Sequence, residues 1–271
     1  MGKCQILLTN DDGIKSPGLW AAAEALSDLG FVTVAAPQAQ SSGMGRSLPS
    51  TSDGTIRTKV MRVRGKEWTV HAVGGSPAQA VLHGILEIMQ QPPDLVVSGI
   101  NYGENVATGV TISGTIGAAL EAASHGLPAL AISLETGREH HFSYSKDVDF
   151  SAAAWFAAYF GRIMLEHHLP PDVDVLKVDV PSAATNRTPW RVTRIARQRY
   201  YVPILHQRRT WEEPGVVDYE EEAILNEEFK GSDVYALRVL HEVSVTPLSL
   251  DLTSRVDLNG LEQLLSHDVV R

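Results

Sequence analysis

The chain is poor in cysteine and has no long uncharged apolar run. Its single cysteine, Cys4, allows no disulfide within the chain and no Cys/His zinc pattern, so we expect a buried or half-buried structural thiol. No stretch approaches the roughly eighteen apolar residues that a membrane span requires. Residues 1–5 lack the apolar core of a signal peptide, and we therefore expect a cytoplasmic protein that does not bind membranes.

Basic residues are also scarce. The chain has 23 Lys and Arg against 32 Asp and Glu, and its formal net charge is −9. Binding to nucleic acid polymers needs a basic surface, so this balance argues against that class of partner. A small anionic substrate stays open, because helix ends and a metal ion can reverse the field inside a pocket.

Several familiar nucleotide and hydrolase motifs are absent from the sequence. There is no G-x-x-x-x-G-K-[ST] P-loop, and no G-x-G-x-x-G follows the first predicted strand. There is also no G-x-S-x-G nucleophile elbow. These absences argue against a P-loop enzyme, a common dinucleotide site and a serine hydrolase.

The 271 residues are 44% hydrophobic and 20% charged, which is typical of a soluble globular protein with a sizeable core. Strand and helix patterns alternate through the first two thirds. Strands are predicted at residues 5–9, 31–36, 94–98, 129–134 and 175–180, and helices at 16–29, 77–90, 113–124 and 148–167. This alternation predicts an α/β fold, with a mainly parallel Rossmann-like sheet flanked by helices in three layers.

The pattern changes after about residue 174. Beyond it, strands are predicted at residues 191–196, 235–239 and 244–246, and a short terminal helix at 258–265. In the first part of the chain, a further pair of strands is predicted at 56–62 and 68–73. We expect one domain over 1–271, with a core of about 1–196, a projecting arm of about 198–232 and a C-terminal segment of about 233–271, the last two forming a β-rich extension. The arm carries Tyr200, Tyr201 and Trp211, which favours contact with a second subunit over a mobile insertion.

Two adjacent carboxylates, Asp11 and Asp12, follow the first apolar strand and precede Gly13. In open α/β sheets, ligands bind at the edge where such a loop lies. Neighbouring carboxylates repel each other, so keeping both ionised requires a cation or full solvation. The pair therefore indicates either a hard divalent metal site or a solvated turn.

Three loops at the same predicted edge lead into helices that begin with a serine cap: Ser16, Ser76 and Ser113. Free N–H groups and the helix dipole make such helix ends suitable for anions. Each cap alone is ordinary, but together with the carboxylates they favour a metal-held phosphate. The His140-His141 pair could also bind a metal, although a solvated pair in a polar loop is the better interpretation.

Five separated blocks of residues recur in a characteristic order over roughly residues 5–134. The blocks are Leu7-Leu8-Thr9-Asn10-Asp11-Asp12-Gly13 with Ser16-Pro17-Gly18, Ala36-Pro37 with Ser42-Gly43, Gly75-Ser76-Pro77, Val97-Ser98-Gly99-Ile100-Asn101-Tyr102-Gly103-Glu104-Asn105, and Ser113-Gly114-Thr115. In these blocks and their order the sequence resembles the SurE family of metal-dependent nucleotidases, also described as acid phosphatases.

The resemblance implies a phosphomonoesterase that hydrolyses nucleoside 5′- and also 3′-monophosphates. It implies one divalent ion, Mg²⁺, Mn²⁺ or Ca²⁺, held by Asp11, Asp12, Ser42 and Asn101. The residues expected to bind the substrate are Asn10, Arg46, Asn105, Ser113, Gly114 and Thr115. The resemblance also implies a homodimer or homotetramer that exchanges its C-terminal arm.

The chain departs from the family pattern at three places. Gln79 stands where an Asp is common, Arg46 stands where Asn or His is common, and Lys177-Val178-Asp179-Val180-Pro181 replaces an Asn-x-Asn-x-Pro block. These departures leave the substrate preference open.

For the mechanism we expect a metal-activated water, with Asp11 or Asp12 as the catalytic base; a covalent aspartyl-phosphate is the rival. Two functional alternatives also stay open: a phosphatase for polyphosphate or another small ester, and a non-catalytic nucleotide-binding protein.

Overall fold

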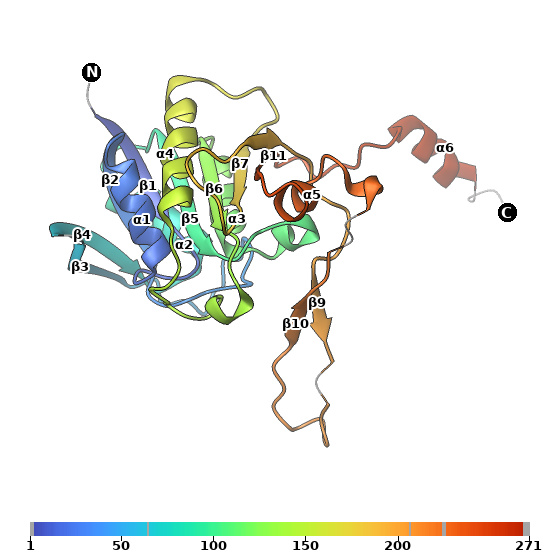
Figure 1. Cartoon of the computed structure of the whole chain (residues 1–271), viewed down its shortest axis with the longest axis horizontal. Coiled ribbons are helices and arrows are strands. Elements are labelled where there is room, and N and C mark those ends of the chain that lie inside the picture. Colours follow the sequence, from blue (N-terminus) through green and yellow to red (C-terminus); the bar gives the residue numbers. More distant parts are fainter. Residues whose placement is uncertain (1–2, 64, 206, 224–225, 268–271) are drawn as a thin grey trace.

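The computed structural model describes residues 3–63, 65–205, 207–223 and 226–267. Within them the chain forms a nine-stranded sheet and a separate two-stranded hairpin (Figure 1). The strand order of the large sheet is β3-β4-β2-β1-β5-β6-β7-β11-β8. Its strands are β1 (Cys4–Thr9), β2 (Gly30–Pro37), β3 (Ile56–Val63), β4 (Lys66–Val73), β5 (Leu95–Tyr102), β6 (Ala129–Leu134), β7 (Val175–Val180), β8 (Trp190–Val192) and β11 (Val243–Leu248).

The middle of this sheet is parallel. Strands β4, β2, β1, β5, β6 and β7 pair in parallel, each with the next. At the two sides, β3 is antiparallel to β4 and β11 is antiparallel to β7. The prediction of a mainly parallel α/β sheet is confirmed, and its carboxyl edge is the expected place for a ligand.

Helices cover both faces of the sheet (Figure 1). Helices α1 and α4 pack on one face and α2 and α3 on the other, so the expected three layers are present. Strand β1 explains this packing: Ile6 and Leu8 point into one core and Leu7 into the other, and all three are fully buried. The helices are α1 (Pro17–Leu26), α2 (Pro77–His83), α3 (Gly114–Ser124), α4 (Ser151–Glu166), α5 (Asp233–Arg238) and α6 (Leu258–His267). Within the described residues, no helix has the length and apolarity to span a membrane.

Some element boundaries differ from the predicted ones. Helix α1 ends at Leu26 instead of residue 29, and β2 already begins at Gly30. Helix α2 ends at His83, after which one π-helical turn (Gly84–Ile88) completes the predicted span. Strand β5 extends to Tyr102, four residues beyond the predicted end at residue 98, and so includes Asn101.

The strand predicted at residues 235–239 is wrong, because these residues lie mostly in helix α5. The apolar and β-branched residues there suggested a strand. The serine before them is a helix cap: the Ser232 hydroxyl accepts a hydrogen bond from Tyr235 N at 3.2 Å.

Strands β9 (Tyr201–Ile204) and β10 (Asp218–Glu221) form an antiparallel hairpin that projects from the body of the molecule (Figure 1). The base of this hairpin is anchored. Tyr200 is only 1% exposed and belongs to a small core with Val106, Ala107 and Leu237. The hairpin therefore begins next to the segment that follows β5.

Candidate active site

Asp11 and Asp12 lie at the carboxyl edge of the sheet, directly after β1. Both are buried, with exposed fractions of 4% and 2%. The loop after β2 approaches from one side, where Ser41 N donates to Asp11 O at 2.7 Å. The end of β5 approaches from the other side, where Tyr102 N donates to Asp12 Oδ2 at 3.3 Å. The sheet thus brings loops that are distant in sequence onto one pair of carboxylates.

The Asp11 side chain packs against the first turn of helix α3. Its Oδ1 accepts a 2.5 Å hydrogen bond from the Thr115 hydroxyl. Gly114 allows this approach, because a Cβ there would lie 2.7 Å from Asp11 Cβ and 2.9 Å from Asp11 Oδ2. Ser113 caps the helix, and its hydroxyl accepts from Ile116 N at 3.1 Å. The carboxylate therefore meets the positive end of a helix dipole.

Gln40 connects Asp12 to the predicted metal ligand Ser42. Its Nε2 lies 3.4 Å from Asp12 Oδ1 and 3.1 Å from Ser42 Oγ. The same nitrogen donates to His141 O at 2.7 Å. Tyr144 adds a further contact, since its hydroxyl donates to Asp12 O at 2.8 Å. Neither Gln40 nor Tyr144 belongs to a motif of the sequence, and the one sequence signal for Gln40 is its position two residues before Ser42.

Burial raises the pKa of both carboxyl groups, and the charge of Asp11 raises that of Asp12 further. Throughout the described ranges, neither carboxylate forms an ion pair with Lys, Arg or His. Two adjacent buried carboxylates without a cationic partner are costly when ionised. A bound cation would remove that cost, so the donor set fits a divalent metal.

Asn101 and Ser42 complete the predicted donor set with neutral oxygens. The register of β5 against β6 shifts between Ser98 and Asn101, an irregularity of the kind that re-aims a side chain. Asn101 Nδ2 donates to Tyr102 O and Gly103 O at 3.1 and 2.7 Å, which leaves the amide oxygen as the atom it can offer to a cation. Among described residues, no three His, Cys, Asp or Glu side chains gather into a metal site, so a metal here would need these oxygens.

Three residues that were predicted to bind the substrate have their side chains bonded to other parts of the protein. Asn10 is fully buried, and its side chain exchanges two hydrogen bonds with the backbone of Gly13, at 3.2 and 3.1 Å. Arg46 Nε contacts Glu121 Oε2 of α3 at 2.6 Å, so a substrate contact must use the other guanidinium nitrogens or break that ion pair. Asn105 is 9% exposed, and its Nδ2 donates to Ser133 Oγ at 2.8 Å.

The expectation of a solvated histidine pair is wrong for His141, which is 7% exposed. Its Nδ1 is 2.7 Å from the Tyr219 hydroxyl of β10, and its ring stacks on that of Tyr219. Burial lowers the pKa of His141, which favours the neutral ring. His141 therefore links the base of the hairpin to the loop that holds Gln40.

Comparisons with known proteins agree with this architecture. The family model described as "Survival protein SurE" matches residues 6–202. A protein of Thermococcus gammatolerans named "5'-nucleotidase SurE" is 43% identical over 262 residues, which cover 96% of each chain. A protein of the same name from Archaeoglobus fulgidus is 43% identical over 259 residues, covering 95% of this chain and 96% of its own. The crystal structure of the SurE protein from Aquifex aeolicus superimposes with a TM-score of 0.74 at 31% identity, covering 96% of this chain and 99% of its own. The chain therefore belongs to the SurE family.

Proposed function

We propose that this chain is a metal-dependent phosphatase that hydrolyses nucleoside monophosphates, with 5′-nucleotides as its main substrates. The observation that carries this proposal is the buried pair Asp11 and Asp12, which has no described cationic partner and whose Asp11 side chain contacts the first turn of α3. The family relatives named as 5′-nucleotidases support the same chemistry.

One divalent ion would be held by Asp11, Asp12, Ser42 and Asn101. All four offer oxygen atoms, which suits Mg²⁺, Mn²⁺ or Ca²⁺ better than zinc or copper. When bound, such an ion would polarise a phosphoryl oxygen and lower the pKa of a water molecule. The link through Gln40 would keep Ser42 next to Asp12 before any ion arrives.

The chain itself supplies the phosphate site and the base. The positive end of the α3 dipole, whose first backbone N–H groups also bind Asp11, would attract the phosphoryl oxygens, and Asn105 would contact them. The attacking water bonds to phosphorus, and either Asp11 or Asp12 takes its proton. The bond from phosphorus to the nucleoside oxygen then breaks. That oxygen takes up the proton held by the aspartate, directly or through water, so the nucleoside leaves as an alcohol.

We also propose that the protein is a homodimer or homotetramer. Two elements outside the core present large apolar side chains to solvent. On the hairpin, Leu205 and Trp211 are 86% and 89% exposed. On helix α6, Leu264 and Leu265 are 66% and 65% exposed. Exposed apolar area of this kind is typical of surfaces that another protein covers.

The function is tested by measuring phosphate release from a panel of 5′- and 3′-nucleotides, polyphosphate and sugar phosphates, with each of the three ions and with EDTA. We expect release from nucleoside monophosphates that depends on the added ion. Asp11→Asn removes one charge from the pair and should lower turnover by about 100-fold or more.

Asp28→Asn is the matched control, because Asp28 is an exposed aspartate near the start of β2, at the opposite edge of the sheet. It should keep full activity. Full activity in Asp11→Asn would contradict the site. Binding of AMP without phosphate release under any ion would instead favour a non-catalytic nucleotide-binding protein.

A further inference from the structure

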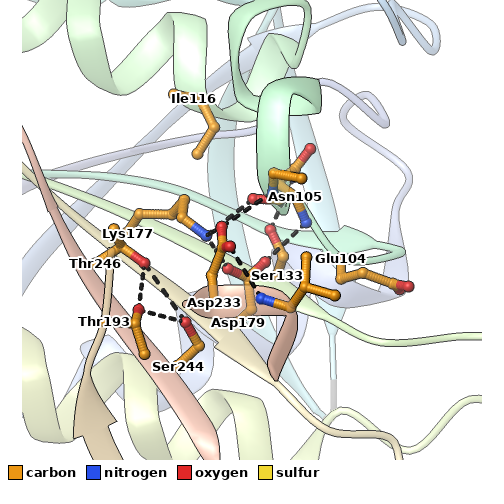
Figure 2. Close-up of polar contacts among 12 residues, drawn as sticks. Glu104, Asn105, Ile116, Ser133, Lys177, Asp179, Thr193, Asp233, Ser244 and Thr246 are labelled. Atoms are coloured by element: carbon orange, nitrogen blue, oxygen red, sulfur yellow. Dashed lines mark hydrogen bonds and ion pairs between the residues drawn. The ribbon is translucent and has the colours of Figure 1, made fainter. Parts of the chain in front are cut away.

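Three charged side chains form a fully buried cluster between β7 and α5 (Figure 2). Lys177 and Asp179 are on β7, Asp233 is the first residue of α5, and each has an exposed fraction of 0%. Lys177 Nζ donates to Asp179 Oδ2 and, at 3.2 Å, to Asp233 Oδ2. Burial lowers the pKa of Lys177, but the two carboxylates more than offset this and raise it, so the lysine stays charged.

This cluster binds the backbone of the loop that carries Asn105. Asn105 N donates to Asp179 Oδ1 at 2.7 Å, and Lys177 Nζ donates to Asn105 O at 3.0 Å (Figure 2). Two residues further on, Ala107 N donates to Asp233 Oδ2 at 3.0 Å. Both backbone groups of Asn105 and the amide of Ala107 are therefore held by charged side chains.

The same loop has a backbone conformation that needs external support. Gly103 has a φ of 93° and Ala107 a φ of 52°, and an alanine rarely adopts such a left-handed conformation by itself. The short 3₁₀ helix that begins at Ala107 runs to Thr111, only two residues before the Ser113 cap of α3. The backbone path of residues 103–107 therefore determines where Asn105 lies and how the chain reaches the N-terminus of α3, where phosphate is proposed to bind.

Asp233 also joins the two ends of the hairpin segment. Its Oδ1 accepts from Ala196 N at 2.9 Å, where the chain leaves the sheet, and its own N donates to Arg194 O at 2.9 Å. Asp233 itself stands where the chain returns to the body. One carboxylate therefore ties the hairpin base, the Asn105 loop and Lys177 together.

We propose that Lys177, Asp179 and Asp233 are positioning residues for phosphate binding: they fix the backbone of loop 103–107 and with it Asn105, the residue proposed to contact the phosphate. The inference rests on the proposed phosphatase function. The Ser133 hydroxyl can accept or donate, so the Asn105 amide, once its backbone is fixed, can turn its NH₂ toward a phosphate. None of the three residues touches Asp11, Asp12, Ser42 or Asn101 through a described hydrogen bond or ion pair. Asn101 bonds to the loop at its first residue, through Gly103 O at 2.7 Å, so loss of the cluster should disturb Asn105 more than the metal ligands.

The test compares the wild-type chain with Asp179→Asn, Asp233→Asn and the double variant Lys177→Met/Asp179→Asn, which leaves no unpaired lysine. Two quantities are measured in each: binding of inorganic phosphate by calorimetry with Mg²⁺ present, and hydrogen exchange of the peptide that covers residues 103–107. We expect the dissociation constant for phosphate to rise about 10-fold or more, exchange in 103–107 to become faster, and Mg²⁺ affinity to change less than about two-fold.

Thr193→Val is the matched control for general loss of stability. The Thr193 hydroxyl lies in a neighbouring buried cluster, 2.8 Å from Ser244 Oγ and 2.7 Å from Thr246 Oγ1, and contacts no part of the loop (Figure 2). It should lower the melting temperature yet leave phosphate binding and exchange in 103–107 unchanged. Unchanged phosphate binding in the cluster variants, or an equal loss in Thr193→Val, overturns the proposal. A wild-type chain that neither binds nor releases phosphate instead refutes the proposed function.

Discussion

At the scale of single residues, Glu104 is a buried acid whose ionisation opposes folding. It is 1% exposed, and its Oε1 accepts a 2.5 Å hydrogen bond from the Tyr200 hydroxyl. Oε2 is buried and has no hydrogen-bond partner among the described residues. Burial is the main cause that raises the pKa of Glu104, to about 7 from an ordinary value of 4.5. At neutral pH a large fraction of this side chain is therefore protonated.

The raised pKa of Glu104 predicts a pH-dependent stability. Because the folded chain holds the proton more tightly, this residue adds no cost below pH 4.5, and its cost grows as the pH rises through 7. The full cost is roughly 3 kcal/mol. Glu104→Gln cannot ionise, so its melting temperature minus that of the wild type should increase by about 5–10 °C between pH 5 and pH 8.

The control for this prediction is the pH dependence of the difference. The glutamine amide oxygen can still accept from the Tyr200 hydroxyl, and any cost of burying its NH₂ group is the same at every pH. Thermal melts monitored by circular dichroism in matched buffers give the difference directly. A difference between the two chains that does not change with pH would show that Glu104 titrates normally.

At the scale of elements, the close contact between helix α3 and Asp11 predicts that one added methyl group at Gly114 lowers activity. A Cβ at position 114 would lie 2.7 Å from Asp11 Cβ, so Gly114→Ala must displace either the carboxylate or the helix. Misplacement of a catalytic group by about 1 Å can cost 100-fold. We expect metal-dependent phosphate release from AMP to fall by about 10- to 100-fold, with the fold retained.

Gly161→Ala on helix α4 is the control, because its Cβ would meet three leucine methyl carbons at 3.4 Å, an ordinary contact distance. Its activity should stay within about two-fold, and its stability should hold or rise, since alanine favours helices. Comparable activity in the two glycine variants would show that the close packing of Asp11 against α3 is not needed for turnover.

The sequence predicted the buried elements better than the exposed ones. Strands β6 and β7 were predicted to the residue, because apolar runs buried on both faces leave a clear pattern. Helix α5 was mistaken for a strand, since six residues are too few for a helical period to show against apolar, β-branched residues.

The candidate site divides in the same way. Asp11, Asp12 and Thr115 follow from local motifs, and the structure brings them together. Gln40 and Tyr144 could not be predicted, because their contacts with Asp12 form only when the loops after β2 and β6 fold over the sheet edge. The buried Lys177 cluster was equally hidden, since Asp233 is 56 positions away from Lys177 in sequence.

At the scale of the whole molecule, the net charge of −9 opposes the approach of an anionic nucleotide. Capture must then come from local features: the start of α3, the cation expected at Asp11 and Asp12, and Asn105. The far end of the hairpin and α6 project from the body of the molecule (Figure 1), and under the proposed assembly their apolar side chains would contact a second subunit.

The exposed leucines of helix α6 predict a substitution that weakens subunit assembly and lies outside the candidate active site. Its apolar residues Leu258, Leu261, Leu264 and Leu265 are 41–66% exposed, and the helix extends away from the sheet (Figure 1). Leu264→Glu places a charge among them, and burying it against a second chain would cost several kcal/mol. In sedimentation velocity at micromolar concentration, we expect the wild type to be a dimer or tetramer and Leu264→Glu to shift to smaller species.

Gln263→Glu adds the same charge one position earlier on α6, where the side chain does not belong to the apolar set, so it controls for net charge alone. It should sediment like the wild type. If both variants dissociate equally, the charge and not the apolar contact governs assembly. If the wild type is itself monomeric, the exposed leucines of α6 contact something other than a second copy of this chain. Phosphate release by the dissociated Leu264→Glu chain then decides whether one subunit carries a complete site, as expected if Asp11, Asp12, Ser42 and Asn101 of a single chain suffice.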